Sequence, residues 1–446
     1  MSQSNNIVII GAGLAGSLLS IYLARRGYCV TVYEARGDMR KESVAAGRSI
    51  NLALSDRGIA ALREIGMDEF MLNEAVPMYG RMIHDPAGTT KLLPYSGREG
   101  EYINSVSRAG LNIALMNEAE KYEQVQIVFN ERCRGLDIDS GEVFFSSRRI
   151  RADTVFATDG AGSPVRQAMQ EQMPEFQFTS VFLDHGYKEL HIPPGPHGSF
   201  LLEKNVLHIW PRHQFMMIAL PNFDGSFTCT LFLDKEILLG LDSEAKVLTF
   251  FELEFPDAVP LMPALVDHFF SNPIGELGTL KCWPWHIDGK VLLVGDSAHA
   301  MVPFYGQGMN CAFEDVRTLN ELLSGPGSML TGSGTDWRSV FENYSALRKS
   351  NTEAIQDMAE ENFYEMRDAT ADPVFQRKRE LETKLEQMFP DYFSKYSMVT
   401  FREDLPYSVA RTKGTAQDKL LMEICANVEN ISKLDLDKIM DELRKL

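Results

Sequence analysis

Residues 7–37 read IVIIGAGLAGSLLSIYLARRGYCVTVYEARG, and this stretch determines the fold of the N-terminal part of the chain. Four consecutive β-branched residues at 7–10 predict a buried strand, and three glycines follow within six positions. The apolar residues after the last glycine predict a helix, and residues 29–33 predict a second strand. A strand, a glycine turn, a helix and a strand in this order indicate a βαβ unit.

The glycines have the Gly-x-Gly-x-x-Gly spacing of dinucleotide-binding proteins, with Ala15 inside the motif and Glu34 ending the second strand. In this motif Gly11 permits the tight turn, Gly13 lets backbone amides approach a pyrophosphate, and Gly16 lets the helix pack closely on the strand. The helix N-terminus then receives the anion. The Glu34 carboxylate would accept hydrogen bonds from an adenosine ribose and disfavour a 2′-phosphate, so the motif fits FAD or NAD rather than NADP.

The composition is that of an ordinary folded protein, and it excludes several classes of partner. The 446 residues suggest two or three domains, and the net charge of −18 would repel nucleic acid and anionic lipid. Six scattered cysteines without a CxxC pair predict reduced core thiols, and none of the nine histidines shows metal-ligand spacing, so no metal is expected. Without a secretory signal or a long apolar run, we expect a cytoplasmic protein that does not enter the membrane.

Two later segments separate FAD from NAD. ATDGAGSPVR (157–166) and VLLVGDSAHAMVPFYGQGMNCAFED (291–315) resemble the downstream signatures of the class A flavoprotein monooxygenases. In that family the aspartate of the GD pair contacts the flavin ribityl chain, which implies the same role for Asp296. The glycine-rich loop that follows would place backbone amides against the flavin pyrimidine edge, at the positive end of a helix.

These motifs predict an α/β fold with three parts. The first is a discontinuous, Rossmann-like FAD-binding domain, the second is an inserted β-sheet substrate domain, and the third is a C-terminal helical module with dense charge. The predicted boundaries are 1–70, 105–175 and 280–330 for the FAD-binding domain, 71–104 and 176–279 for the substrate domain, and 331–446 for the helical module.

Further segments resemble the kynurenine 3-monooxygenase family. They are EARGDMR (34–40), GRSINLALSDRG (47–58), RMIHDPAG (81–88), INSVSRAGLN (103–112) and VPFYGQGMN (302–310). The resemblance runs from residue 7 to about residue 410. Animal members of this family carry a C-terminal membrane anchor, whereas this chain ends in charged amphipathic helices, which is typical of a soluble, bacterial-type member.

The resemblance implies a set of site residues. Arg81 would hold the α-carboxylate of kynurenine through a two-pronged charge-assisted pair, and Tyr95, Asn362 and Tyr407 would supply neutral donors and acceptors. We expect Phe232, Pro303 and Phe304 to form a dry wall around the reacting atoms. The implied cofactor-binding residues are Gly11, Gly13, Ala15, Gly16, Glu34, Arg36, Ala53, Arg108, Cys133, Asp159, Asp296, Gly308, Met309 and Asn310.

The resemblance also implies a reaction. NADPH would reduce the flavin, O₂ would add to form a C4a-hydroperoxyflavin, and L-kynurenine would be hydroxylated to 3-hydroxykynurenine. The aniline nitrogen already activates the ortho carbon, so no catalytic acid or base is assigned. Two alternatives stay open: a class A hydroxylase of another aromatic acid, and a flavin-binding redox sensor with little turnover. A homodimer is also left open.

Overall fold

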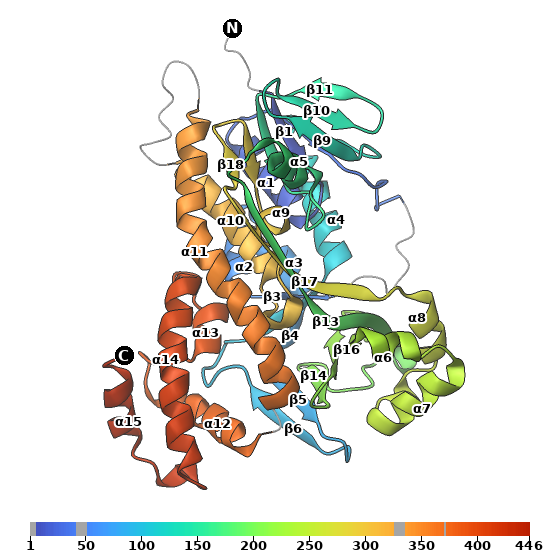
Figure 1. The fold of residues 1–446 in the computed structure, drawn as a ribbon. Coiled ribbons are helices and arrows are strands. Elements are labelled where there is room, and N and C mark those ends of the chain that lie inside the picture. Colours follow the sequence, from blue (N-terminus) through green and yellow to red (C-terminus); the bar gives the residue numbers. More distant parts are fainter. Residues whose placement is uncertain (1–5, 42–50, 325–334, 370–371) are drawn as a thin grey trace.

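The computed structural model describes residues 6–41, 51–324, 335–369 and 372–446 (Figure 1). Its N-terminal βαβ unit belongs to a six-stranded sheet of order β18-β19-β12-β1-β2-β8, which is parallel except for β18. The strands are β1 (Ile7–Ile10), β2 (Val30–Tyr33), β8 (Val125–Val128), β12 (Thr154–Ala157), β18 (His286–Ile287) and β19 (Val291–Leu293). The predicted strands at both ends of the βαβ unit are thereby confirmed.

Helices and two small sheets surround this sheet. The helices are α1 (Leu14–Arg25), α2 (Asp56–Glu64), α3 (Asp68–Asn73), α4 (Arg108–Ala119), α5 (Pro164–Gln172), α9 (Asp296–His299) and α10 (Gly308–Leu322). The small sheets are β3 (Asn51–Leu54), β7 (Ile103–Ser107) and β4 (Val76–Met78), and β9 (Cys133–Asp137), β10 (Glu142–Phe145) and β11 (Arg149–Arg151).

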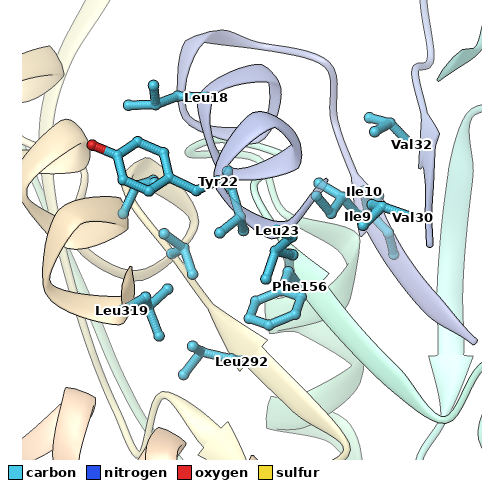
Figure 2. Close-up of a cluster of buried hydrophobic side chains, with 14 of the residues drawn as sticks. Ile9, Ile10, Leu18, Tyr22, Leu23, Val30, Val32, Phe156, Leu292 and Leu319 are labelled. Carbon is cyan, nitrogen blue, oxygen red and sulfur yellow. The ribbon is translucent and has the colours of Figure 1, made fainter. Parts of the chain in front are cut away.

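Aliphatic and aromatic side chains from the sheet and its helices form the largest buried cluster (Figure 2). Leu18 and Leu23 of α1 and Phe156 of β12 are almost fully buried in it. Each such side chain stabilises the fold by roughly 1.5–3 kcal/mol through removal of apolar surface from water. This core fixes the carboxyl ends of β1, β2 and β12, where the glycine motif begins.

A second sheet of seven strands has the order β17-β13-β16-β15-β14-β5-β6. Its strands are β5 (Gly80–His84), β6 (Thr90–Pro94), β13 (Gln177–Ile192), β14 (Leu207–Pro211), β15 (Met216–Pro221), β16 (Phe227–Asp234) and β17 (Gly275–Trp283). The neighbours are antiparallel except β5 and β14, which run parallel. On its outer side lie α6 (Lys235–Gly240), α7 (Glu244–Glu254) and α8 (Leu265–Ser271).

The chain closes with helices that run along both sheets, orange to red in Figure 1. They are α11 (Trp337–Tyr364), α12 (Pro373–Met388), α13 (Lys395–Thr400), α14 (Tyr407–Ala426) and α15 (Leu436–Leu443). Among the described helices, none is both long and apolar enough to cross a bilayer. The predicted α/β class with an inserted sheet and a helical C-terminal region is confirmed.

One expectation about the cysteines was wrong. Cys29 is exposed, whereas the other five cysteines are buried. Cys29 directly precedes β2, which begins at Val30, so its side chain stays outside the core.

Candidate active site

A cavity of about 670 Å³ lies between the two sheets. One end is lined by the glycine motif and the ends of β1, β2 and β12. The other end is lined by side chains of the seven-stranded sheet, together with Tyr396 and Met366 from the C-terminal helical region. The cavity therefore joins a dinucleotide site to a second compartment.

The three motif glycines have the physical roles expected of them. Gly11 has a φ of +101°, and a Cβ atom there would lie 2.6 Å from the Thr158 carbonyl oxygen. A Cβ on Gly16 would lie 2.0 Å from the Gly11 carbonyl oxygen, so α1 could not pack this closely with any other residue. A Cβ on Gly13 would meet nothing within 4 Å, because Gly13 faces the cavity. Space for a ligand is left at Gly13.

Glu34 lines the cavity at the end of β2. One carboxylate oxygen accepts a hydrogen bond from the Ala12 N–H at 2.9 Å, and the other accepts from Arg36 Nε at 2.8 Å. Burial opposes ionisation, but the bonds from Arg36 and Ala12 hold the pKa of Glu34 below its ordinary value. An ionised acceptor is thereby ready for ribose hydroxyls.

The residues at this end fit FAD. The N-terminus of α1 has no side-chain cap and no acidic residue in its first turn, so its free amides can receive a pyrophosphate. Asp159 lines the same wall, and its buried Oδ1 atom has no hydrogen-bond partner within the described structure. Burial raises the pKa of Asp159 to about 6. A ligand hydroxyl donated to this oxygen would satisfy it.

The loop between β19 and α10 forms the side wall. Gly306 has a φ of +67° and a Cβ there would lie 2.9 Å from Ala53 Cβ, so the loop and β3 are in close contact. The Asn310 amide donates to the carbonyl oxygens of Ala53 and Gly306, and its oxygen accepts from the Ser55 N–H. Asn310 thus fixes the loop that presents Gly308 and Met309 to the cavity.

The second compartment contains a buried cation between aromatic rings. Arg81 on β5 is 8% exposed, and its guanidinium lies 5.0 Å from the Tyr396 ring centroid and 5.8 Å from that of Tyr95. Tyr95 and Tyr396 are stacked at 5.2 Å. Arg81 Nε has no hydrogen-bond partner in the described structure, and the Glu365 carboxylate lies 3.9 Å from Nη1. Arg81 Nε is therefore available to donate to a second carboxylate.

The rest of this compartment is largely apolar. Phe232 and Phe304 pack at 4.9 Å between ring centroids, and Pro303, Leu207, Ile218 and Met301 complete the wall. Thr230 lies among them with a buried hydroxyl that has no partner in the described residues. A largely apolar pocket with a cation at one end and the Thr230 hydroxyl on its wall suits an aromatic acid.

The structure brings most of the expected site residues to this cavity. The lining includes Gly11, Gly13, Ala15, Glu34, Arg36, Ala53, Arg108, Cys133, Asp159, Asp296, Gly308, Met309, Arg81, Tyr95, Phe232, Pro303 and Phe304. Gly16, Asn310, Asn362 and Tyr407 are not among the described lining residues. The sequence did not point to Tyr396, because nothing local distinguishes it from other buried aromatic residues of the helical region.

Asn362 and Tyr407 lie one layer behind the wall. The Asn362 amide donates to the Phe304 carbonyl oxygen at 2.6 Å, and the Tyr407 hydroxyl donates to Gln307 Oε1 at 3.0 Å. Both are buried and both hold the loop of residues 303–307. Their geometry supports a positioning role, and direct substrate contact stays a prediction.

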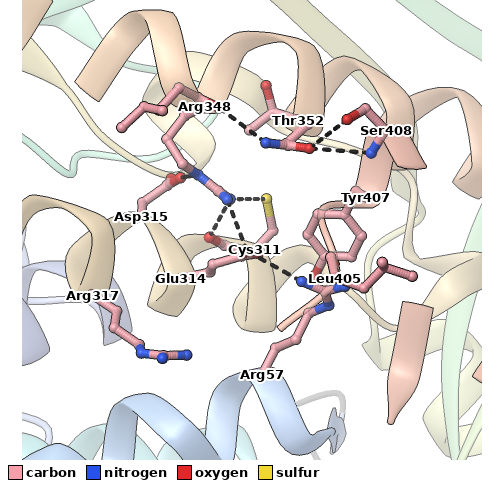
Figure 3. A network of polar contacts seen from close by, with 12 residues as sticks. Arg57, Cys311, Glu314, Asp315, Arg317, Arg348, Thr352, Leu405, Tyr407 and Ser408 are labelled. Atoms are coloured by element: carbon pink, nitrogen blue, oxygen red, sulfur yellow. Dashed lines mark hydrogen bonds and ion pairs between the residues drawn. The ribbon is translucent and has the colours of Figure 1, made fainter. Parts of the chain in front are cut away.

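Behind Tyr407 lies a buried ionic network (Figure 3). Arg348 pairs with Asp315 at 2.7 Å and Glu314 at 3.1 Å, and Arg57 pairs with Glu314 at 3.2 Å. Potential ligand atoms of His299, Cys311 and Asp315 lie within 4.8 Å of one another, a grouping that sequence spacing did not reveal. Because the Arg348 guanidinium already neutralises the Asp315 carboxylate, we assign no metal to this group of three residues.

Comparison with known proteins identifies the class first. Residues 4–213 and 279–359 match the family of FAD binding domains. A solved structure of the tetrameric form of 2-methyl-3-hydroxypyridine-5-carboxylic acid oxygenase superposes with a TM-score of 0.66 over 84% of this chain and 96% of that one, at 20% identity. The structure of PqsL of P. aeruginosa in complex with 2-aminobenzoylacetate superposes with a TM-score of 0.65 over 81% of this chain and 99% of that one, at 18% identity. The fold is that of the FAD-dependent aromatic hydroxylases.

Two curated relatives then narrow the assignment. Kynurenine 3-monooxygenase of Myxococcus xanthus is 46% identical over 99% of this chain and 96% of its own. Kynurenine 3-monooxygenase of Dictyostelium discoideum is 43% identical over 98% of this chain and 97% of its own. The chain belongs to the kynurenine 3-monooxygenase family.

Proposed function

We propose that this chain hydroxylates L-kynurenine to 3-hydroxykynurenine, with FAD as bound cofactor, NADPH as reductant and O₂ as oxidant. The observation that carries the proposal is the buried Arg81 guanidinium with a free Nε donor, set in the same cavity as the FAD-fitting glycine motif. The membership of a family whose curated members bear this activity in their names supports it.

Arg81 is suited to the α-carboxylate of an amino acid. Its planar fork can donate two parallel hydrogen bonds, and the rings of Tyr95 and Tyr396 keep water away from them. Burial opposes its charge, but the neighbouring Tyr396, Tyr95 and Glu365 raise the pKa of Arg81, so it remains a cation. Glu365 is near enough to attract the α-ammonium group of the same substrate.

Thr230 is suited to the other end of kynurenine. The strand register places Thr230 three strands from Arg81 and two residues along, roughly 15 Å between backbones. An Arg81 side chain and an extended kynurenine together span about this distance. The free Thr230 hydroxyl would then bond the aniline nitrogen or the ketone oxygen, and fix which ring carbon faces the flavin.

The protein's work in this reaction is orientation and water exclusion. Bound FAD supplies the activated oxygen after reduction by NADPH. Phe232, Pro303 and Phe304 keep the reacting region dry, and Asn362 and Tyr407 hold the loop that carries two of them. The amine of kynurenine already enriches the ortho carbon in electrons, so the mechanism needs no protein base.

We propose that the three predicted parts act as follows. Residues 1–70, 105–175 and 280–330 hold FAD, residues 71–104 and 176–279 supply the substrate sheet, and residues 331–446 close the cavity. Separate hydrophobic clusters at the six-stranded sheet, on the outer side of the seven-stranded sheet and among the last helices support three parts. The start of α11 packs in the first of these clusters, and a further cluster joins the seven-stranded sheet to α11, α13 and α14.

We also propose a cytoplasmic location. All six cysteines are free thiols, which suits a reducing compartment, and NADPH is a cytosolic reductant.

The decisive experiment measures NADPH oxidation by the FAD-loaded protein with and without L-kynurenine, paired with product mass. We expect strong stimulation and a product heavier by one oxygen atom. Stimulation by 4-hydroxybenzoate with none by kynurenine would favour another class A hydroxylase. Bound FAD without stimulation by either compound would favour a redox sensor.

A further inference from the structure

The strand that carries Arg81 ends at His84, whose side chain is on the opposite face of the sheet. His84 Nδ1 lies 2.7 Å from Asp257 Oδ2, and His84 Nε2 lies 2.8 Å from His208 Nδ1 on β14. His208 Nε2 lies 2.8 Å from the Glu203 carbonyl oxygen. Three short contacts therefore link Asp257, His84, His208 and the backbone of residue 203 in one chain.

The number of hydrogens needed in this hydrogen-bond chain follows from its geometry. Each of the three contacts joins two atoms with lone pairs, so each needs one hydrogen between them. Two neutral imidazoles supply only two hydrogens. The third must be held by Asp257 or by a second nitrogen of one imidazole.

Several neighbours favour a positive charge on His84. Asp257 also accepts hydrogen bonds from Trp210 Nε1 at 2.9 and 3.0 Å, so its oxygens act as acceptors. The Trp210 ring stacks on His84 at 4.1 Å, as cations prefer. Of the charged groups on the surrounding elements, Arg212 faces three carboxylates, those of Asp85 after β5, Glu254 of α7 and Asp257. One arginine therefore faces three carboxylates, and protonation of His84 would reduce the net negative charge of this group.

The other two titratable groups in this series of contacts, His208 and Asp257, do not favour the third proton. Burial lowers the pKa of His208 to about 4. Although burial alone would raise it, the pKa of Asp257 is lowered by the bonds from His84 and Trp210. His84 is left to carry the third proton.

The position of His84 gives that charge a structural consequence. β5 joins the rest of the sheet through only three paired residues of β14, beginning with Arg81 opposite Leu207. Its other neighbour, β6, is the edge strand. The bond from His84 to His208, whose backbone pairs with Met82, adds a side-chain link between β5 and β14 beside this short ladder.

We propose that His84 is a protonated positioning residue, whose imidazolium bridges Asp257 and His208 and holds the Arg81 strand in place for the substrate carboxylate. The catalytic part of this inference rests on the proposed function. The protonation part does not.

The protonation is tested on the FAD-loaded enzyme with ¹⁵N-labelled histidine at pH 7. The spectrum of His84→Gln assigns the His84 signals. We expect both His84 ring nitrogens to carry hydrogen and His208 to be neutral. A neutral His84 in the wild-type protein overturns the proposal, whatever the enzyme turns over.

The positioning is tested at Asp257. Asp257→Ala frees the His84 ring, so KM for kynurenine should rise about three- to tenfold while kcat stays near wild type. Asp257→Asn can donate to a neutral His84 and should restore KM, while its His84 loses the imidazolium signal. Kynuramine, which lacks the carboxylate, should show the same KM in all three proteins. Glu252→Ala, an exposed carboxylate on α7, is the matched control.

Two outcomes of the kinetic test would contradict the proposal. One is an unchanged KM for kynurenine in Asp257→Ala that binds FAD and melts cooperatively. The other is an equal rise in KM for kynuramine, which would show general disruption of the pocket. If wild-type enzyme does not respond to kynurenine at all, the proposed function fails, and the NMR result still decides the state of His84.

Discussion

Replacing Arg81 by alanine tests the substrate assignment most directly. The guanidinium is 8% exposed and its only ion pair in the described structure is with Glu365 at 3.9 Å. It is therefore available to a carboxylate in a nearly dry site. Loss of one partner of such a buried pair costs about 2–5 kcal/mol, or roughly thirtyfold to several thousandfold in affinity.

The assay is a titration of the flavin absorbance with L-kynurenine, supported by steady-state KM. Arg81→Ala should bind FAD normally, because the glycine motif is at the other end of the cavity. Arg81→Lys should recover only part of the loss, since an ammonium cannot reproduce the planar fork. Arg149→Ala, an exposed arginine on β11, should behave as wild type.

The decarboxylated substrate provides the refuting result. Kynuramine should bind wild type weakly and be nearly indifferent to Arg81→Ala, because the interaction is already absent. If Arg81→Ala keeps the wild-type affinity for kynurenine, or weakens the binding of kynuramine equally, then Arg81 does not bind the carboxylate.

Three further changes have defined outcomes. Gly13→Leu should abolish FAD binding, measured by bound-flavin absorbance, because its side chain would occupy the space left for the pyrophosphate. Gly240→Leu, at another unobstructed glycine, should bind FAD normally. Normal FAD content in Gly13→Leu would refute the glycine assignment. Thr230→Val should raise KM for kynurenine about three- to tenfold, while Thr279→Val, at a buried hydroxyl away from the cavity, should leave it unchanged. The pKa of Asp159 is raised by burial from 3.8 to about 6, so its contribution to apoprotein stability is present below pH 4 and lost as the pH rises through 6. Asp159→Asn should therefore stabilise the FAD-free protein by about 1–3 kcal/mol at pH 7 and not at pH 4, read from urea unfolding, and equal effects at both pH values would contradict this.

The part of the site that sequence could predict is the part that local physics dictates. Gly11 and Gly16 could be predicted from the sequence because their backbone geometry and close packing admit no side chain, whatever the rest of the chain does. Glu34 could be predicted because a parallel strand ends at a known distance from the glycine turn. Arg81 and Tyr95 came from family resemblance, and the structure brings both to the cavity.

The part that sequence could not predict depends on how distant elements pack. Tyr396 and Tyr407 both lie near the start of a helix, eleven positions apart, and only the packing of α13 and α14 against the loop decides which lines the cavity. The link from His84 to His208 joins residues 124 positions apart, and no local pattern encodes such a contact. Asn362 illustrates the same limit, since its partner is a backbone oxygen of residue 304.

The cavity draws its walls from Ile10 near the start of the chain to Tyr396 near its end. On the ribosome, the glycine motif emerges first and can fold with its neighbouring strands. The FAD end of the cavity is complete once Ala312 has been synthesised, whereas the substrate end stays open until the helix that carries Tyr396 has docked. Closure of the substrate compartment is therefore a late event in biogenesis, and nascent chains stalled before residue 396 should lack a closed kynurenine pocket even where they already hold flavin.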